Sequence, residues 1–290
     1  MKTPRTLFFL FLSLLTLASC SDDADAPEFA LLAYSPETGA PGTEVTLTGS
    51  GFPSDPSEVS VTIGGVAAPV VSVSETRIVV SVPAGAASGE IRVTANGVTR
   101  TSSGGFTVLS QLVAETFSNL EAPQTGSQGE PEGGPFTKFS FATGQVTESE
   151  TEWDIAFRGT TLAVNGGAPT GTADEPERNG NGGAAIQDGT FAEITSAEGL
   201  TFAQDAPGAY AIPTGSGNGW YNYNPATFTI NPIPGKILVF RTHDGRYAKV
   251  EILSYYRDAP AQPDPFTDES RVYTFRYVYN PNQGEMTLAQ

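Results

Sequence analysis

Short segments in which hydrophobic and polar residues alternate run through the first part of the chain, between Phe29 and Val108. Because successive side chains of a β-strand point to opposite faces, a period of two predicts strands that are buried on one face. Residues that favour turns, chiefly Gly, Pro and Asn, separate these segments. The predicted strands are residues 44–49, 59–63, 77–82 and 90–94. We therefore expect a small β-sandwich in this part of the chain.

The clearest hairpin pattern lies within residues 219–256, which we take as the functional centre of the chain. Asp244-Gly245 predicts a two-residue type I′ turn, because both residues tolerate a positive φ. The hairpin would have an aliphatic face that seals a core and an amphipathic face that lies under a loop or solvent. The predicted aliphatic pairs are Ile237 with Ile252, Val239 with Val250 and Arg241 with Ala248, and the amphipathic pairs are Leu238 with Glu251, Phe240 with Lys249 and Thr242 with Tyr247.

Aromatic residues are concentrated just before this hairpin. Trp220, Tyr221 and Tyr223 precede Asn224-Pro225, and Phe228 follows within a few residues. Because Asn-Pro favours a turn, the segment is expected to form an aromatic-rich loop. These four aromatic residues are the candidate ligand-binding residues of the chain.

A second aromatic pattern occupies the last predicted strand, residues 271–279. Alternation places Tyr273, Phe275, Tyr277 and Tyr279 on one face of that strand. Such a stripe can be a stacking platform for a flat ligand or a packed core. Core packing is the favoured interpretation, because large aromatic side chains are mostly buried in folded proteins.

Composition supports an all-β protein. The chain has 290 residues, including 32 Gly and 22 Pro, which favours many turns over long helices and allows two modest domains. Its formal net charge is -17, and no basic run offsets it. This excess of acid argues against binding to nucleic acid through a basic patch.

The N-terminus has the pattern of a bacterial lipoprotein. Lys2 and Arg5 precede an apolar stretch, residues 7–17, that is short for a membrane span and typical of a signal peptide. Cys20, the only cysteine, directly follows Leu17-Ala18-Ser19, which looks like a lipobox. That resemblance implies lipid attachment at Cys20 and cleavage before it. The predicted divisions are a signal peptide over 1–19, an acidic tether over 20–29, and domains over 30–109 and 110–290.

The first predicted domain resembles the IPT/TIG immunoglobulin-like family. The resemblance rests on its turn residues, which are Ser35-Pro36, Pro41-Gly42, Gly49-Ser50-Gly51-Phe52, Gly64-Gly65 and the closing Gly105-Phe106-Thr107-Val108. It implies an immunoglobulin-like β-sandwich without chemistry of its own. Two roles remain open for this domain, a rigid spacer and a contact surface for protein or glycan, and the spacer is favoured.

The second predicted domain resembles the HmuY-like family of haem-binding lipoproteins from Bacteroidetes-type bacteria. The segments that carry this resemblance are residues 153–158 (WDIAFR), 165–167 (NGG), 182–184 (GGA) and 244–256 (DGRYAKVEILSYY). It implies a larger antiparallel β domain that takes up haem for iron acquisition. It also implies display on the outer membrane, and contact with host haemoproteins and an outer-membrane receptor.

The iron ligands of that family do not carry over to this chain. Family members hold haem iron between two axial histidine or methionine side chains, and beyond Met1 this chain offers only His243 and Met286. His243 is expected to be a solvated turn residue, and Met286 belongs to the tail. The hypothesis is a retained pocket that binds haem weakly through stacking or through Tyr221 or Tyr223, or that binds another planar apolar ligand.

The sequence gives less support for a cation site or a catalytic site. Asp174, Glu175 and Glu177 suggest a cation site, but their spacing matches no known calcium loop, and a solvated charge run is the favoured interpretation. With its one cysteine assigned to lipid and a single histidine, the chain offers no nucleophile and base pair, so we predict neither catalytic residues nor an enzyme. The alternative function is a surface adhesion or glycan-binding lipoprotein without haem activity.

Overall fold

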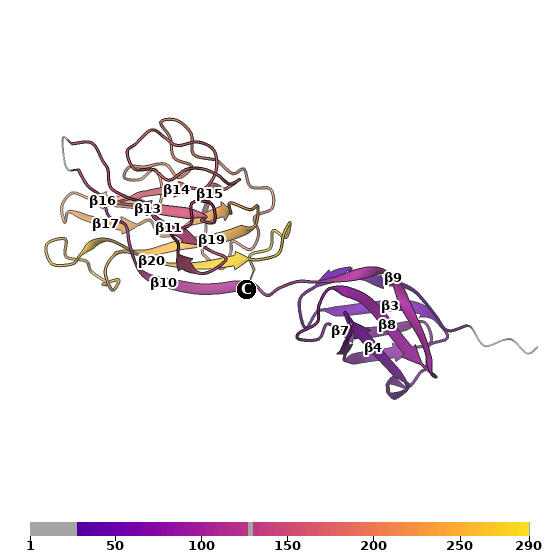
Figure 1. Ribbon diagram of the computed structural model, residues 1–290. Coiled ribbons are helices and arrows are strands. Elements are labelled where there is room, and N and C mark those ends of the chain that lie inside the picture. The colour runs from indigo at the N-terminus through magenta and orange to yellow at the C-terminus, as the bar shows by residue number, and fades with distance from the viewer. Residues whose placement is uncertain (1–27, 127–129, 290) are drawn as a thin grey trace, which may run out of the picture. The chain divides into compact units, whose positions relative to one another are not determined.

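The computed structural model describes residues 28–126 and 130–289 (Figure 1). The predicted signal peptide, Cys20 and most of the predicted tether lie outside these residues. The described chain is all-β, as predicted, and its one helical element is the 3-10 turn η1 (Pro56–Glu58). No helix in these residues is long and apolar enough to cross a membrane.

The chain divides into two compact units at Thr107, with the short segment Thr38–Pro41 grouped with the second unit. The first unit contains two sheets, ordered β1-β3-β7-β6 and β2-β9-β8-β4-β5. Their strands are β1 (Ala30–Ser35), β2 (Thr38–Gly39), β3 (Glu44–Ser50), β4 (Val59–Ile63), β5 (Val66–Ala68), β6 (Val70–Ser74), β7 (Arg77–Ser81), β8 (Gly89–Ala95) and β9 (Val98–Val108).

The alternating pattern produces this sandwich. In β3, Val45 and Leu47 are fully buried while their neighbours are at least partly exposed. In β7, Ile78 and Val80 are fully buried on one face, and Val79 on the other face is also buried. Val61 of β4 repeats the pattern in the other sheet. Each strand therefore contributes one apolar face to the core, and the four predicted strands correspond to β3, β4, β7 and β8.

The second unit consists of a five-stranded sheet, β10-β20-β19-β18-β15, a four-stranded sheet, β12-β11-β13-β14, and a two-stranded ribbon, β16-β17. The pairings within these three sheets are antiparallel. Their strands are β10 (Val113–Glu121), β11 (Thr137–Ser140), β12 (Gln145–Val146), β13 (Ile155–Arg158), β14 (Thr161–Val164), β15 (Gly183–Asp188), β16 (Tyr221–Asn224), β17 (Thr229–Pro232), β18 (Lys236–Arg241), β19 (Tyr247–Tyr256) and β20 (Ser270–Asn280).

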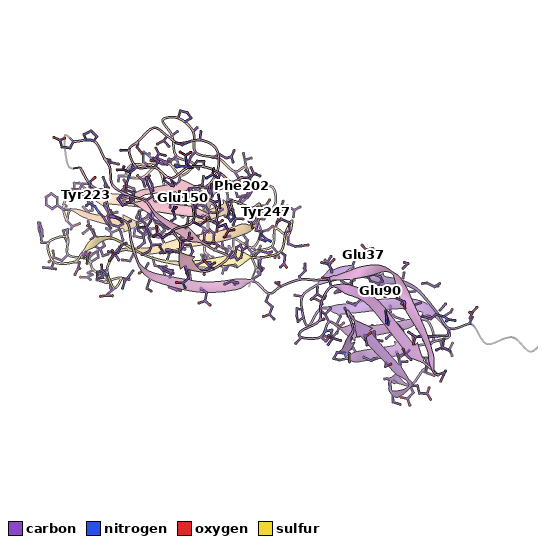
Figure 2. The ribbon with its side chains drawn as sticks, in the orientation of Figure 1. Glu37, Glu90, Glu150, Phe202, Tyr223 and Tyr247 are labelled. Carbon is purple, nitrogen blue, oxygen red and sulfur yellow. The ribbon has the colours of Figure 1, made fainter. Side chains whose placement is uncertain are left out.

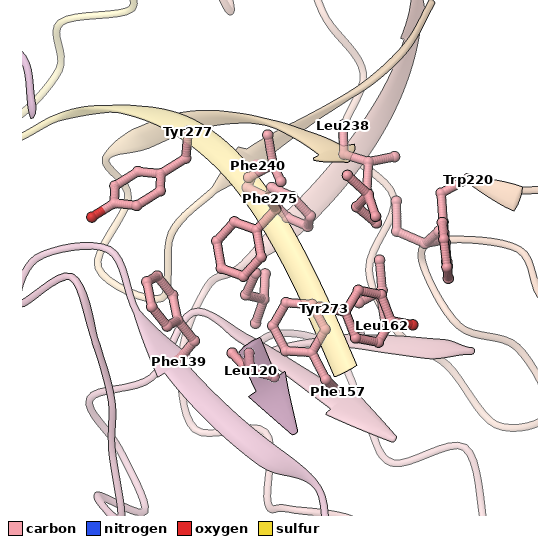
Figure 3. Packing of buried hydrophobic residues seen from close by; sticks show 14 of the residues in the cluster. Leu120, Phe139, Phe157, Leu162, Trp220, Leu238, Phe240, Tyr273, Phe275 and Tyr277 are labelled. Carbon is pink, nitrogen blue, oxygen red and sulfur yellow. The ribbon is translucent and has the colours of Figure 1, made fainter. Parts of the chain in front are cut away.

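Aromatic side chains fill the space between the two larger sheets (Figure 3). Phe157 of β13 lies 4.9 Å from Tyr273 and 5.6 Å from Phe275 between ring centroids, and Phe139 of β11 lies 5.3 Å from Phe275. The Tyr273 hydroxyl donates to the carbonyl oxygen of Gly159 at 2.8 Å, so its polar end is satisfied inside the core. The aromatic stripe of β20 is therefore core, as the favoured interpretation held.

The hairpin of β18 and β19 has a different register from the predicted one. Leu238 pairs with Val250 and Phe240 with Ala248, one residue away from the predicted pairs. The reason is a three-residue loop: the Gly245 N–H donates to the Thr242 carbonyl, Gly245 has a φ of 88°, and Thr242 pairs with Arg246. A type I turn followed by a left-handed glycine adds one residue to the two-residue turn that was expected.

This shift exchanges the two faces of β18 relative to the prediction and leaves those of β19 as predicted. Leu238, Phe240 and Val250 enter the main aromatic core, whereas Ile237 and Val239 pack on the opposite face against the segment around Phe191 and Ala197. Both faces of β18 are thus buried. The prediction of one core face and one face under a loop was right for β19, whose Ala248, Val250 and Ile252 lie in the core, and wrong for β18.

The glycines of segments 165–167 and 182–184 lie where two stretches of backbone approach closely. A Cβ at Gly166 would lie 2.0 Å from the carbonyl oxygen of Gly182, and a Cβ at Gly182 would lie 2.7 Å from that of Asn165. The Gly182 N–H donates to the same Asn165 carbonyl at 2.7 Å. Glycine is needed at both positions because any side chain would separate the two segments.

Candidate ligand-binding site

The predicted aromatic loop is a two-stranded ribbon. Tyr221 pairs with Pro232 and Asn224 with Thr229, so β16 and β17 form a hairpin joined by residues 225–228. The Asn224 side chain accepts the Ala226 N–H at 3.0 Å and starts the turn. Phe228 ends it with a φ of 56°, a left-handed conformation that is rare for a bulky residue.

A cavity of about 580 Å³ lies between this ribbon and the end of β19. Its aromatic lining comes from Tyr221, Tyr223 and Phe228 of the ribbon and its loop and from Tyr255 and Tyr256 of β19. The Tyr256 hydroxyl accepts the Ile230 N–H at 3.0 Å and so fixes the ribbon against β19. The cavity wall therefore depends on contacts between segments that are distant in sequence.

Three of the four candidate residues, Tyr221, Tyr223 and Phe228, line this cavity. The fourth, Trp220, packs beside Tyr221 in the core. Tyr221 is buried, whereas Tyr223 and Phe228 are 42% and 58% exposed. Trp220 belongs to the core, where its ring lies 5.0 Å from that of Tyr221 and its Nε1 donates to the Thr160 carbonyl at 3.0 Å. Figure 2 shows Tyr223 at the end of the second unit opposite Tyr247, the first residue of β19.

Sequence reasoning missed Tyr255, Tyr256 and Arg271 as cavity residues. It also did not identify Phe266 as an exposed aromatic residue that contacts Phe228. Phe266 is 83% exposed, and its ring lies 6.3 Å from the Phe228 ring in an edge-to-face arrangement. The Tyr-Tyr pair gave no usable signal, because strand alternation would separate the two rings, whereas both are buried in the same core at a register shift of β19. Phe266 gave no signal, because its loop has no periodic pattern.

Burial raises the pKa of the Tyr255 phenol well above its ordinary value, and the neighbouring Arg271 guanidinium offsets only part of that effect. Tyr255 therefore stays protonated at physiological pH and offers a neutral hydroxyl to the cavity. A phenolate donor at this position is not available.

A second cavity, of about 720 Å³, adjoins the first and shares Glu132, Thr160 and Tyr221 with it. Its character is different, because hydroxyl groups line much of it. They belong to Thr160, Thr161, Thr170, Thr172, Thr214, Tyr210 and Tyr221. This cavity suits a polar ligand better than a flat apolar one.

The acidic loop before β15 is only partly a solvated charge run, because Asp174 and Glu177 are exposed but the Glu175 side chain is not. Arg178 is fully buried and binds both Glu175 (2.7 Å) and Asp205 (2.9 Å). Although burial opposes it, hydrogen bonds from Thr170 and Thr172 hold the pKa of Glu175 at about 2. The expectation of solvated carboxylates was wrong for Glu175, which anchors the loop beneath the second cavity.

His243 is not the solvated turn residue that was expected. Its side chain is 19% exposed, and its Nδ1 lies 2.7 Å from Oδ1 of buried Asp154. Asp154 also accepts the His243 N–H at 3.1 Å and, through Oδ2, the Phe141 N–H at 2.7 Å. The hydrogen bond to Asp154 raises the pKa of His243. This contact joins Asp154 of the 153–158 segment to His243, which directly precedes the 244–256 segment, and so it serves the fold.

Neither His243 nor Met286 lines the aromatic cavity. His243 precedes β19 and the cavity lies at the other end of that ten-residue strand, which spans about 30 Å at about 3.3 Å per residue. The backbone carbonyl of Met286 accepts the Ala197 N–H, far along the sheet from Tyr255. Both residues are therefore separated from the ribbon by the length of the domain.

Two family models match the chain. The IPT/TIG domain model covers residues 31–108, and the HmuY protein model covers residues 135–277. The second domain belongs to the HmuY family. It follows an IPT/TIG domain, as the sequence resemblances implied. Among curated proteins, nothing matches the chain.

Solved structures resemble parts of the chain at low identity. An apo HmuY analogue from Tannerella forsythia is 13% identical with a TM-score of 0.39, covering 60% of this chain and 99% of its own. A Bacteroides vulgatus protein described as HmuY-like and heme-binding is 14% identical with a TM-score of 0.34, covering 59% and 93%. An auxiliary nutrient binding protein from Bacteroides thetaiotaomicron is 16% identical with a TM-score of 0.28. The alignment with it covers 78% of this chain but only 57% of that protein. These likenesses carry no argument about the ligand.

Axial ligation of haem iron by histidine or methionine does not fit the HmuY domain of this chain. The aromatic cavity offers phenols, threonine and serine hydroxyls, an amide, one carboxylate and one guanidinium, but no imidazole or thioether. Within residues 28–126 and 130–289, no cluster of three or more His, Cys, Asp or Glu side chains could hold a metal ion.

Proposed function

We propose that this protein is an envelope lipoprotein whose HmuY domain binds haem or a related planar, apolar ring, without catalysing a reaction. The observation that carries the proposal is the cavity of about 580 Å³ with aromatic side chains from both the ribbon and β19. Small-molecule sites have volumes of about 300 to 1,000 Å³, and this cavity falls within that range.

The exposed position of the aromatic residues supports a binding role. Tyr223, Phe228 and Phe266 leave large apolar surfaces in water, which costs free energy that burial in the core would recover. Phe228 in addition holds a left-handed backbone. Strained, exposed residues of this kind are concentrated at ligand sites, where the surrounding structure maintains them for function.

Stacking is the mode of binding that this lining supports. Flat rings pack well against aromatic side chains at centroid distances of about 4.5 to 7 Å, and the cavity presents rings from two separate segments. No iron ligand from this cavity is required. A carrier that holds its cargo by stacking alone would also release it readily to a receptor.

The anchor is part of the proposal. Lipid attachment at Cys20 would tie the chain to the outer membrane, and the acidic residues that follow would act as a solvated tether. In this arrangement the IPT/TIG domain is a spacer that precedes the binding domain, and the protein is exposed at the cell surface to haem, host haemoproteins and an outer-membrane receptor.

The proposal is tested by titrating metal-free protoporphyrin IX into the protein that starts at Ser21, which retains every described residue. We expect saturable quenching of protein fluorescence and a shifted porphyrin absorbance band. Tyr223→Ala and Phe228→Ala should each weaken binding by about 2- to 12-fold, the range of one aromatic contact. Tyr210→Ala, in the second cavity, is the matched control and should bind normally. Absence of binding, or unchanged binding in both cavity variants, would refute the proposal.

A second candidate function rests on the second cavity. Its threonine and tyrosine hydroxyls could hydrogen-bond a neutral sugar, which agrees with the alternative of a glycan-binding surface lipoprotein. A glycan array probed with the same protein separates the two. A specific signal lost in Tyr210→Ala but kept in Tyr223→Ala would support the glycan function, and the absence of any signal would remove it.

A further inference from the structure

Arg271 is built into the rim of the aromatic cavity. It is the second residue of β20, and the preceding residue, Ser270, pairs with Tyr256. The Arg271 carbonyl accepts the Ala122 N–H at 2.8 Å, and its Nη1 donates to the Gln124 carbonyl at 3.2 Å. Its φ is 66°, a left-handed conformation that an arginine rarely adopts. Main-chain contacts therefore fix where this guanidinium lies.

The charge of Arg271 has no carboxylate partner within the described residues. The nearby acids Glu121 and Glu269 both bind Arg257, at 3.0 and 2.5 Å. No described carboxylate lies within 4 Å of the Arg271 guanidinium, in a chain with a formal net charge of -17. Acidic residues outnumber basic residues in this protein, and yet this exposed arginine beside the cavity forms no ion pair with a described carboxylate.

The Arg271 guanidinium and the acidic residue of the lining lie on different sides of the aromatic cavity. Arg271 lines only the aromatic cavity, beside Tyr255 and Tyr256. The acidic residue of the lining, Glu132, belongs to both cavities and therefore lies toward their shared wall. A ligand in this cavity could thus place an anionic substituent at Arg271 and keep its apolar part away from Glu132.

We propose that the ligand of this cavity carries a carboxylate and that Arg271 binds it. The inference rests on the proposed function and adds a chemical requirement to it, a flat apolar ring with an acidic substituent. A guanidinium presents paired N–H donors that match the two oxygens of one carboxylate. A phosphate is the weaker fit, because phosphate sites gather several cations or main-chain N–H groups, and the described lining has one cation.

The test compares protoporphyrin IX with its dimethyl ester, which has the same ring but no acid groups. Wild-type protein should bind the diacid about tenfold or more tightly than the ester. Arg271→Gln should abolish that preference by weakening the diacid alone, and Arg271→Lys should restore part of it as a point charge. Arg257→Gln removes an equal charge outside the cavity lining and should keep the preference. Thermal unfolding verifies that each variant is folded.

The outcomes separate the inference from the proposed function. Equal binding of diacid and ester by wild-type protein, unchanged in Arg271→Gln, would overturn the carboxylate assignment and leave the ring site standing. Equal weakening of both ligands in Arg271→Gln would show that Arg271 only supports the cavity wall, which also overturns it. Binding of neither compound by wild-type protein would overturn both proposals.

Discussion

At the scale of single residues, Phe228 links backbone strain to ligand contact. Its φ of 56° is unfavourable for a large side chain, and more than half of that side chain is exposed. Phe228→Gly should therefore leave the stability unchanged or raise it by up to about 1 kcal/mol, because glycine adopts this φ without strain. The same change should weaken porphyrin binding. Urea unfolding and a binding titration on one sample measure both effects.

Phe228→Asn is the matched control, since asparagine tolerates the left-handed region but offers no aromatic surface. It should behave like the glycine variant in both measurements. If instead Phe228→Gly lost stability, the side chain would be serving the fold, and the strain at this position would have no functional meaning.

His243 gives a prediction about pH. The hydrogen bond to Asp154 raises the folded-state pKa of His243 above its ordinary value of 6.5. The contact therefore stabilises the fold fully below about pH 6.5, and its contribution declines as the pH rises through the folded-state pKa. The difference in unfolding free energy between wild type and His243→Gln should shrink with rising pH over that window. Urea unfolding at several pH values measures it.

The chain contains one histidine, so its proton NMR signal can be followed without ambiguity. Titration of wild type should give a pKa above 6.5, and Asp154→Asn should bring it back toward the ordinary value. A wild-type pKa at or below 6.5 would contradict the pairing.

The sequence could predict some residues of the cavity but not others. Tyr221, Tyr223 and Phe228 were recognisable as an aromatic group beside a turn, and these three line the cavity. The burial of Trp220 was not predictable, because the pattern does not show which aromatic in a short segment turns inward. Arg271 and Tyr255 come from other strands, and only the folded sheet brings them to the ribbon.

At the scale of elements, the β18–β19 hairpin shows what turn chemistry can and cannot decide. Asp244-Gly245 correctly located the turn, but it suits both a two-residue loop and the last part of a three-residue loop. Thr242 decided between them, since its Oγ1 accepts the Arg246 N–H at 2.7 Å and stabilises the longer loop. One added residue then reversed the faces of β18 but not those of β19, because the side-chain period of a strand is two.

Lys249 lies on the face of β19 that the pattern placed under a loop or solvent, and a loop covers it. Its side chain is buried on the face opposite the aromatic core, where Nζ donates to the carbonyls of Phe191 and Ile194 at 2.7 and 2.8 Å. Burial lowers the pKa of this lysine, and the charge of Arg276 adds to the effect. Lys249→Met should destabilise the domain by about 2 to 4 kcal/mol, because two buried carbonyls lose their donor.

Lys236→Met on the adjacent strand is the control. Lys236 is partly exposed and pairs with an exposed Asp188, so its replacement should change stability by about 0.5 kcal/mol or less. Urea unfolding of both variants decides the matter. Equal effects would mean that Lys249 does not hold the 191–194 segment against the sheet.

At the scale of the whole molecule, the proposal joins an anchor, a spacer and a binding domain. The strand patterns were strong enough to predict the all-β class, because alternation and turn residues repeat along each domain. The two families were recognised from the resemblance of short motifs, and the family models match them. The anchor rests on Cys20 alone. In a bacterial host that acylates lipoproteins, wild-type protein should incorporate labelled fatty acid and fractionate with membranes, and Cys20→Ser should do neither. Ser21→Ala is the control that keeps the label. Labelling of Cys20→Ser would contradict the anchor.

The central claim is that the HmuY domain holds a flat ring by stacking and without a histidine or methionine ligand to iron. The most direct measurement compares the affinity and absorbance of haem with the affinity of metal-free protoporphyrin IX in the same protein. We predict affinities within about threefold of each other, since the contacts to the ring are the same, and a haem spectrum without the low-spin signature of two axial His or Met ligands. Haem binding about a hundredfold tighter than porphyrin, with a low-spin spectrum, would contradict the claim.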